Sequence, residues 1–255
     1  MSEQSKFTGN SPLWNEEEIL SEELEKDNVK PYVSAAVVKR LPRYFRYLRE
    51  LLRQGRMRIS SGELSSLMNV TASQIRQDLN CFGGFGQQGY GYNVNYLFAK
   101  ICDILGVGSG YHAIIIDAGD LGRALAKTGM FEKRGVDILA LFDQNPENIG
   151  RPIQDIPVYN LDTLEDFCAK NPVDIAVLTL PQKEMVRPIA QRLSQCGILG
   201  IWNYTGVELK LDREDIAVES THLGDFLMIL NFKIGQKQEK SEETIPETNS
   251  EESED

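Results

Sequence analysis

Residues 112–125 read HAIIIDAGDLGRAL, an apolar run followed by a turn with two glycines and the start of a helix. A short uninterrupted apolar run is typical of a strand that is buried on both faces of a parallel sheet. A dinucleotide-binding turn reads G-x-G-x-x-G, and here Gly119 and Gly122 take the second and third glycine positions while Asp117 replaces the first. The stretch therefore predicts the strand–turn–helix unit of a Rossmann domain, altered at one position.

A second predicted strand, Val136–Phe142, ends in Asp143, about 20 residues after the turn, where an acid accepts hydrogen bonds from the adenosine ribose hydroxyls. No arginine adjoins Asp143, so a 2′-phosphate would be repelled and NAD is favoured over NADP. The predicted cofactor site comprises Asp117, Ala118, Gly119, Asp120, Leu121, Gly122 and Asp143.

Strands and helices alternate after Asp143. Helices are expected at 161–168 and within 181–196, the latter interrupted by Pro188, and strands at 173–180, 200–202 and 216–218. This alternation predicts a doubly wound α/β domain with a parallel sheet. The alternative is a Rossmann scaffold that no longer binds a dinucleotide.

A different kind of segment precedes this domain. Residues 41–54 read LPRYFRYLRELLRQ, with apolar side chains at helical spacing on one side and arginines on the other. Pro42 suits a first helical turn, and Gly55 suits a helix end. Two capping boxes follow, Ser60–Glu63 and Thr71–Gln74, so two further helices are expected with a tight turn between them.

This arrangement predicts a helix-turn-helix, and the glycine- and aromatic-rich run 83–92 predicts the β-hairpin wing of a winged helix. Side chains near the start of the third helix are of the types that reach base edges. The predicted DNA-binding residues are Arg43, Arg46, Arg58, Ser73, Gln74, Arg76, Gln77, Asn80, Gln87 and Gln88. The alternative is a small helical domain with a solvated arginine face.

Charge is segregated along the 255 residues, whose net charge is -11. Residues 31–95 contain nine basic and three acidic side chains, and most of the bases are arginines, whose planar fork suits phosphate. Glu50, Glu63 and Asp78, the acids of this module, are expected to be solvated surface charges. The expected organisation is 1–30, disordered acidic tail; 31–95, winged helix; 96–221, Rossmann domain; 222–235, C-terminal helix; 236–255, disordered acidic tail.

Composition excludes several classes of protein. No apolar run approaches the roughly 20 residues that cross a bilayer, and the polar, acidic start is not a signal peptide. The four cysteines are far apart, so reduced thiols in a cytoplasmic protein are expected rather than a disulfide framework or a zinc ribbon. Only two histidines are present, so a multi-histidine metal site is excluded and no metal is expected.

The last helix is apolar through Leu223, Phe226, Leu227 and Leu230. An apolar helix at the end of a chain requires a surface that covers it, either in its own domain or in a second subunit.

The two-module pattern resembles the Rex family of redox-sensing transcriptional repressors over about 38–234. The resemblance is carried by these motifs: 39–42 KRLP, 58–61 RISS, 74–79 QIRQDL, 89–94 GYGYNV, 140–143 ALFD, 149–150 IG, 156–159 IPVY and 197–201 GILGI. It implies a homodimer that exchanges the C-terminal helix and binds a palindromic double-stranded DNA operator. It also implies that NADH releases the operator, whereas NAD⁺ or the absence of cofactor permits binding.

The chain departs from the family pattern at several positions. The family has glycine at Asp117, commonly a second basic residue at Gln77, a basic pair at Gln87–Gln88, and an aspartate at His222.

Two other functions stay open. One is a Rex-like repressor whose cofactor site has degenerated, so that it binds DNA independently of NADH. The other is an NAD-dependent enzyme, which is disfavoured because His112 stands at the start of the first Rossmann strand, His222 opens the last helix, and a separate substrate domain is lacking. We therefore expect a regulator and not an enzyme.

Overall fold

The computed structural model describes residues 33–81 and 91–242. The chain forms two compact units, Met1–Ser109 and Gly110–Asp255, which are described separately. The first unit extends beyond the expected boundary at residue 95. The reason is helix α6 (Val94–Leu105), which buries Leu97, Phe98 and Ile101 in the core of that unit.

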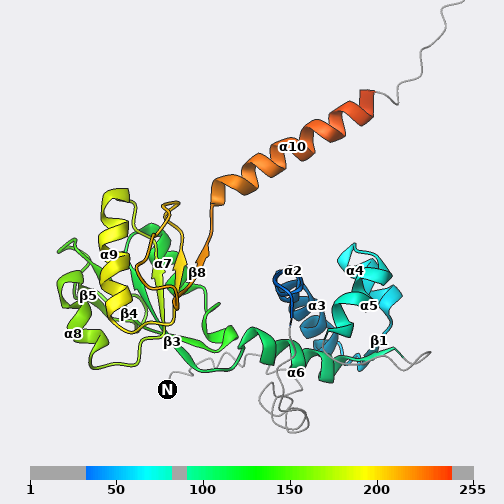
Figure 1. Ribbon diagram of the computed structural model, residues 1–255, viewed down its shortest axis with the longest axis horizontal. Coiled ribbons are helices and arrows are strands. Elements are labelled where there is room, and N and C mark those ends of the chain that lie inside the picture. The colour runs from blue at the N-terminus through cyan, green and yellow to red at the C-terminus, as the bar shows by residue number, and fades with distance from the viewer. Residues whose placement is uncertain (1–32, 82–90, 243–255) are drawn as a thin grey trace, which may run out of the picture. The chain divides into compact units, whose positions relative to one another are not determined.

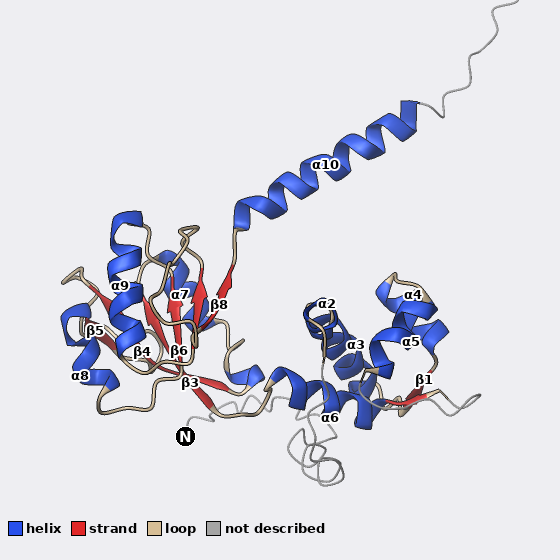
Figure 2. Ribbon diagram, in the orientation of Figure 1, coloured by secondary structure: helices blue, strands red, loops and turns tan. Residues whose placement is uncertain are grey.

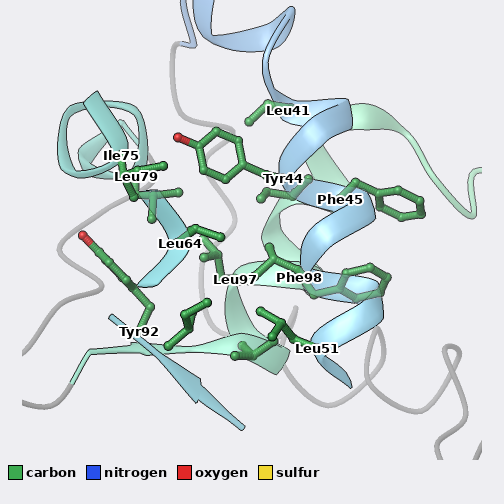
Figure 3. Close-up of a cluster of buried hydrophobic side chains, with 14 of the residues drawn as sticks. Leu41, Tyr44, Phe45, Leu51, Leu64, Ile75, Leu79, Tyr92, Leu97 and Phe98 are labelled. Carbon is green, nitrogen blue, oxygen red and sulfur yellow. The ribbon is translucent and has the colours of Figure 1, made fainter. Parts of the chain in front are cut away.

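The first unit is built from helices around one apolar core. Its helices are α2 (Ala35–Val38), α3 (Leu41–Arg53), α4 (Ser61–Met68), α5 (Ala72–Asn80) and α6 (Figure 1). Tyr44, Leu64, Ile75 and Leu97 are fully buried side chains of this core (Figure 3). All five helices contribute to it, α2 through Val37. Burial of one such leucine stabilises the fold by about 1.5–3 kcal/mol.

Side chains at the helix ends specify where α4 and α5 begin. Ser60 and Glu63 form the predicted reciprocal capping box at the start of α4. Glu63 also bonds Arg56 at 2.6 Å, so it is not merely a solvated charge. Hydrogen bonds from the Ser60 backbone and hydroxyl, then from Arg56, lower the pKa of Glu63 to about 2. At α5 only half of the second predicted box exists, since Thr71 accepts from the Gln74 N–H but the Gln74 side chain bonds elsewhere.

The described part of the wing is a pair of short antiparallel strands. Strand β1 (Arg58–Ile59) pairs with β2 (Tyr92–Asn93), with Ile59 opposite Tyr92. Gly91 has φ +70°, and a Cβ there would lie 2.7 Å from the Ile59 carbonyl oxygen, so a glycine is required where the chain enters β2. Gln87 and Gln88, two of the predicted DNA-binding residues, lie outside the described residues.

The second unit contains a six-stranded parallel sheet in the order β5-β4-β3-β6-β7-β8 (Figure 2). The strands are β3 (Tyr111–Ile116), β4 (Val136–Asp143), β5 (Val158–Asn160), β6 (Ile175–Leu178), β7 (Gly200–Asn203) and β8 (Ala217–Ser220). This is the Rossmann strand order, and it reverses between β3 and β6. The predicted doubly wound sheet is confirmed.

Both faces of the sheet are covered. Alternate residues of β3 separate the two layers: Ile114 and Ile116 belong to the core beneath α8 (Leu164–Cys168) and α9 (Lys183–Gln195), and Ile115 to the core beneath α7 (Asp120–Lys127). Two 3₁₀ turns, Glu132–Arg134 and Leu161–Thr163, complete the connections.

The expected interruption of the helix at Pro188 is wrong: α9 continues through this residue. The buried side chains of Val186, Ile189 and Leu193, on either side of Pro188, hold the helix to the sheet despite the missing N–H.

The last helix, α10, spans Leu223–Glu242 and is longer than the expected 222–235. The segment from 236 therefore begins as helix and not as a disordered tail. Large apolar side chains on α10 are exposed, namely Leu223, Phe226, Leu227, Met228, Ile229, Leu230, Phe232 and Ile234. Over the described stretches of chain, no helix combines the length and apolarity that a membrane span requires.

Candidate nucleic-acid interface and nucleotide site

Helix α5 presents most of the predicted base-reading side chains to solvent. Ser73, Arg76, Gln77 and Asn80 are exposed, because Ile75, Asp78 and Leu79 turn the other side of the helix into the core. Arg76 donates to the Ser61 hydroxyl at 3.2 Å, a contact at the exposed surface that leaves its guanidinium accessible.

Gln74, predicted to belong to the same reading surface, has a different role. Its amide donates to Asp78 at 2.8 Å and its side chain is partly buried. The position of Gln74 in the sequence predicts that its side chain points to solvent. In the structure the side chain turns instead toward the carboxylate of Asp78, to which it donates a hydrogen bond.

The three arginines predicted to hold phosphates are not equivalent. Arg46, on α3, and Arg58, on β1, are exposed. Arg43 is partly buried and donates to the Met68 carbonyl at the end of α4. This bond holds α3 against α4, while the remaining N–H groups of the Arg43 guanidinium can still donate to an anion.

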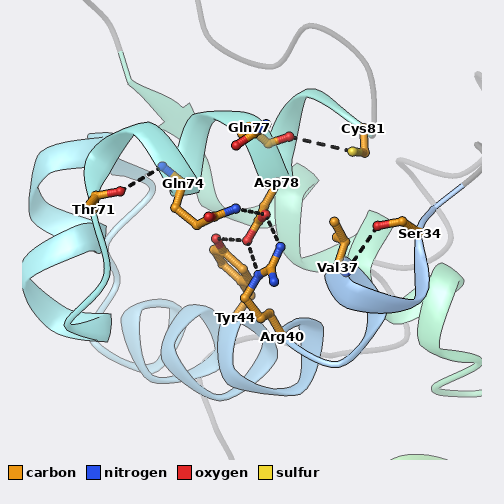
Figure 4. Close-up of polar contacts among 9 residues, drawn as sticks. All are labelled: Ser34, Val37, Arg40, Tyr44, Thr71, Gln74, Gln77, Asp78 and Cys81. Atoms are coloured by element: carbon orange, nitrogen blue, oxygen red, sulfur yellow. Dashed lines mark hydrogen bonds and ion pairs between the residues drawn. The ribbon is translucent and has the colours of Figure 1, made fainter.

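Asp78, expected to be solvated, is instead almost completely buried, with 1% of its surface exposed. Its carboxylate accepts two hydrogen bonds from Arg40 (2.8 and 2.6 Å), one from the Tyr44 hydroxyl (3.0 Å) and one from Gln74 (Figure 4). Burial by itself raises the pKa of Asp78, but the bonds from these three donors outweigh it and hold the pKa below its usual value. The periodic spacing of apolar residues in the sequence does not predict this cluster of polar side chains around Asp78.

In the second unit, the turn after β3 is shaped by Asp117. Asp117 has φ +87°, a region that glycine adopts freely and other residues adopt at a cost of about 1–3 kcal/mol. Its carboxylate accepts a hydrogen bond from the Gly119 N–H at 2.9 Å. The side chain therefore occupies a backbone donor of the turn that would otherwise face a phosphate.

Of the two remaining glycines of the turn, Gly122 is required by close approach to backbone, whereas a Cβ at Gly119 would meet only the Asp117 side chain. A Cβ at Gly122 would lie 2.0 Å from the Asp117 carbonyl oxygen and 3.2 Å from the Thr179 hydroxyl oxygen. A Cβ at Gly119 would lie 2.5 Å from the Asp117 carboxylate. Gly122 thus permits contact between α7 and the sheet, as the predicted fingerprint implies.

Asp143, at the end of β4, is 6% exposed and organises the adjoining loops. It accepts hydrogen bonds from the Ala118 N–H (2.9 Å), the Asn145 N–H (2.7 Å) and the Asn148 amide (2.8 Å). A carboxylate has about four acceptor positions, so this set leaves room for a further donor such as a ribose hydroxyl.

Arg123, six residues after Asp117, does not neutralise it. It donates instead to the Ala118 carbonyl at 2.7 Å and to the Asn148 side-chain oxygen at 2.7 Å. Burial raises the pKa of Asp117, the Gly119 N–H lowers it, and the charges of Asp143 and Asp120 raise it further. The pKa of Asp117 therefore lies above its usual value and, over the described residues, no basic side chain among its hydrogen-bond partners offsets the carboxylates of Asp117 and Asp120 beside the helix N-terminus.

A cavity of about 260 Å³ opens at the carboxyl ends of β3, β4 and β6. Its lining includes Asp117, Gly119, Asp143, Asn148, Leu180 and Gln182. Because the strand order reverses between β3 and β6, this is the position at which open α/β sheets bind ligands. Among the predicted residues, Asp117, Gly119 and Asp143 line the cavity, whereas the Asp120 side chain is exposed and Ala118 and Gly122 are buried.

This cavity fits the ribose end of a nucleotide better than it fits a diphosphate. Asp143, Asn145 and Asn148 supply hydrogen-bonding groups of the kind that bind hydroxyls, whereas the Gly119 N–H is already bonded to a carboxylate. Within residues 33–81 and 91–242, no group of three or more His, Cys, Asp or Glu side chains is arranged to hold a metal ion.

Comparisons with known proteins agree with this two-module architecture. A family described as "Putative DNA-binding protein N-terminus" matches residues 32–80, and a "CoA binding domain" family matches residues 109–207. Fold and site thus define a class of protein in which a winged helix-turn-helix is joined to a Rossmann nucleotide-binding domain.

The particular family follows from a relative in Thermoanaerobacter sp. (strain X514), a "Redox-sensing transcriptional repressor Rex". It is 48% identical over 209 residues, which cover 82% of this chain and 92% of the relative. The chain belongs to the Rex family of redox-sensing transcriptional repressors.

Solved structures of RSP, a Rex-family repressor, are also similar. RSP in complex with beta-NAD+ and operator DNA is 46% identical, with a TM-score of 0.76 over 84% of this chain and 99% of RSP. RSP in complex with beta-NADH is 43% identical, with a TM-score of 0.74 over 82% of this chain and 98% of RSP.

We predict that Gly122→Ala destabilises the second unit by about 1–3 kcal/mol, since the new methyl must displace backbone. Gly200→Ala is the matched control, because its Cβ would meet only ordinary contacts, the nearest at 3.5 Å. Thermal unfolding measures both variants. Equal melting temperatures for the two variants would show that the backbone of the turn accommodates the methyl group without loss of stability.

Proposed function

We propose that this chain is a DNA-binding transcriptional repressor that responds to the NADH/NAD⁺ ratio and leaves its operator when NADH binds. The observation that carries the proposal is the solved complex of RSP, 46% identical, with beta-NAD+ and operator DNA together. The close relatives are named repressors, and we extend this to a regulatory, non-enzymatic role for this chain in the cytoplasm.

Roles on the DNA surface follow from exposure. Arg76 and Gln77 read bases in the major groove, with Ser73 and Asn80 beside them. Arg43, Arg46 and Arg58 hold phosphates. Gln87 and Gln88, which lie outside the described residues, are assigned to DNA contact from the sequence alone. Gln74 contributes through its bond to Asp78 and not as a primary base-reading side chain.

In the cofactor site, we assign the turn Asp117–Gly122 to the diphosphate end, with Asp117 and Gly119 lining the cavity. Asp143 accepts hydrogen bonds from the adenosine ribose. We assign NAD(H) as the cofactor. When bound, it supplies the reduced or oxidised nicotinamide whose state the repressor distinguishes. The residues of this chain bind and orient it, and no bond in it is made or broken.

Assembly as a homodimer is proposed from α10. Exposed apolar side chains occupy consecutive positions, from Phe226 to Leu230, and so surround the helix instead of forming one stripe. A helix that is apolar all round is suited to burial on several sides, and a second subunit that exchanges α10 would supply it. A two-fold dimer also matches a palindromic operator. We assign DNA binding to 31–95, in a unit that also includes α6 as far as Leu105. We assign cofactor binding to the sheet domain that follows, and exchange to 222–235, which contains the apolar first part of α10.

A second candidate function is favoured by one observation, the bond between the Asp117 carboxylate and the Gly119 N–H. In this alternative, the chain is a Rex-like repressor that binds DNA whether or not NADH is present. Repulsion between Asp117 and a phosphate at about 4 Å reaches about 4 kcal/mol at an effective dielectric constant of 20. The helix N-terminus offsets only about 0.3–1 kcal/mol at an exposed site.

We expect Arg76→Ala to weaken operator binding by about 1–3 kcal/mol and to relax sequence preference, because a base-edge contact is lost. Arg46→Ala should lower the slope of log affinity against log salt by about one without changing preference. Arg187→Ala, which removes the same charge in the second unit, is the control. Unchanged binding by Arg76→Ala at moderate salt would exclude α5 as the reading helix.

Removal of 222–255 should produce monomers or insoluble protein, because the partner surface for α10 is lost. Removal of 243–255 alone, beyond the end of the helix, is the control and should leave assembly unchanged. Sedimentation velocity distinguishes the species. A soluble, monodisperse dimer without residues 222–255 would contradict helix exchange.

Asp117→Gly should tighten NADH binding at least tenfold, about 1.4 kcal/mol, because it removes a charge and releases the Gly119 N–H for the ligand. The NADH affinity of Asp117→Asn, which removes the charge alone, should lie between the affinities of the unmodified chain and of Asp117→Gly. Isothermal calorimetry of all three proteins gives the affinities. If the unmodified chain binds NADH as tightly as Asp117→Gly, the turn accommodates this aspartate and the first candidate function is favoured.

A further inference from the structure

One buried carboxylate joins the proposed reading helix to the helix behind it. Asp78 lies on α5, while Arg40 immediately precedes α3 and Tyr44 lies one turn into it. Arg40 donates through Nε and Nη2 to the two oxygens of Asp78, and Tyr44 and Gln74 add one bond each (Figure 4). All four hydrogen bonds converge on a side chain with 1% exposure.

These bonds restrict the rotation of α5 about its own axis. Apolar contacts of Ile75 and Leu79 hold the helix in the core, but such contacts are non-directional. The fork of Arg40 bonds both carboxylate oxygens and thereby adds a geometric requirement. Since successive residues are about 100° apart around a helix, a rotation by one residue would replace the outward set of side chains with another.

We propose that Asp78 is a positioning residue for base reading: bound to Arg40, Tyr44 and Gln74, it sets the rotation of α5 that presents Arg76 and Gln77. The inference rests on the proposed DNA binding by α5. It assigns Arg40 to this internal pair and not to a phosphate, and it explains why Gln74 turns inward.

A purely stabilising role would not require an ion pair here. A buried ion pair commonly contributes no more stability than well-packed apolar side chains of the same volume, because both charges must lose their hydration. What a bidentate pair adds is direction. The expected signature of the proposal is therefore lost discrimination between DNA sequences, beyond any loss of stability.

The experiment uses the full-length chain and a duplex that the unmodified protein selects from a random pool. Affinity is then measured for this duplex and for a series in which one base pair at a time is changed. We expect Asp78→Asn to lose at least tenfold in affinity and to flatten the preference at several positions. The salt slope should remain, because Arg46 and Arg58 are untouched.

Glu63→Gln is the matched control. It removes another carboxylate of the same unit, bonded to Ser60 and Arg56 at the start of α4, and should lower the melting temperature without changing base preference. Tyr44→Phe and Gln74→Ala each remove one donor and leave the Arg40 pair intact, so they remain informative if Asp78→Asn does not fold. Each should flatten the preference partially.

Normal base preference in folded Asp78→Asn overturns the inference. If Asp78→Asn does not fold, normal preference in both Tyr44→Phe and Gln74→Ala overturns it instead. If the unmodified chain selects no duplex, the proposed DNA binding fails and the inference fails with it. The two failures are therefore distinguishable.

Discussion

A buried carboxylate must be supplied with hydrogen-bond donors, and this requirement organises both units of the chain. In the first unit Asp78 draws Arg40, Tyr44 and Gln74 together and so links α5 to α3. In the second, Asp143 collects donors from the turn after β3 and from the loop after β4. Asp78 lies directly behind the proposed reading surface and Asp143 lines the proposed cofactor cavity, so satisfying each charge also arranges a binding surface.

The turn after β3 illustrates a conflict between two uses of the same backbone donor. The Gly119 N–H can bond an external phosphate or the Asp117 carboxylate, and it bonds the carboxylate. Arg123, which could have neutralised Asp117, is committed to Ala118 and Asn148. The architecture of a Rossmann cofactor site is therefore complete in its strand order and its ribose end, while its phosphate end contains an internal competitor.

Helix α10 connects the proposed assembly with the proposed DNA recognition. Its consecutive apolar side chains make it unsuited to water, and burial between two subunits would remove them from it. A dimer formed in this way repeats the basic surface of the first unit by two-fold symmetry, as a palindromic operator requires. In the proposed dimer, the apolar helix and the arginines of the first unit thus serve one function.

The sequence by itself determined the features that depend on local patterns. Apolar periodicity, helix caps and the spacing of Gly119, Gly122 and Asp143 predicted the winged helix, the parallel sheet and the location of the nucleotide pocket, because these patterns act over a few residues. Only the tertiary structure decided where polar side chains point: Gln74 inward, Asp78 buried, Arg123 away from Asp117. These outcomes depend on donors and acceptors that are far apart in the sequence and that the fold brings together, such as Arg40 and Asp78. Local sequence patterns do not show which distant residues become neighbours in space.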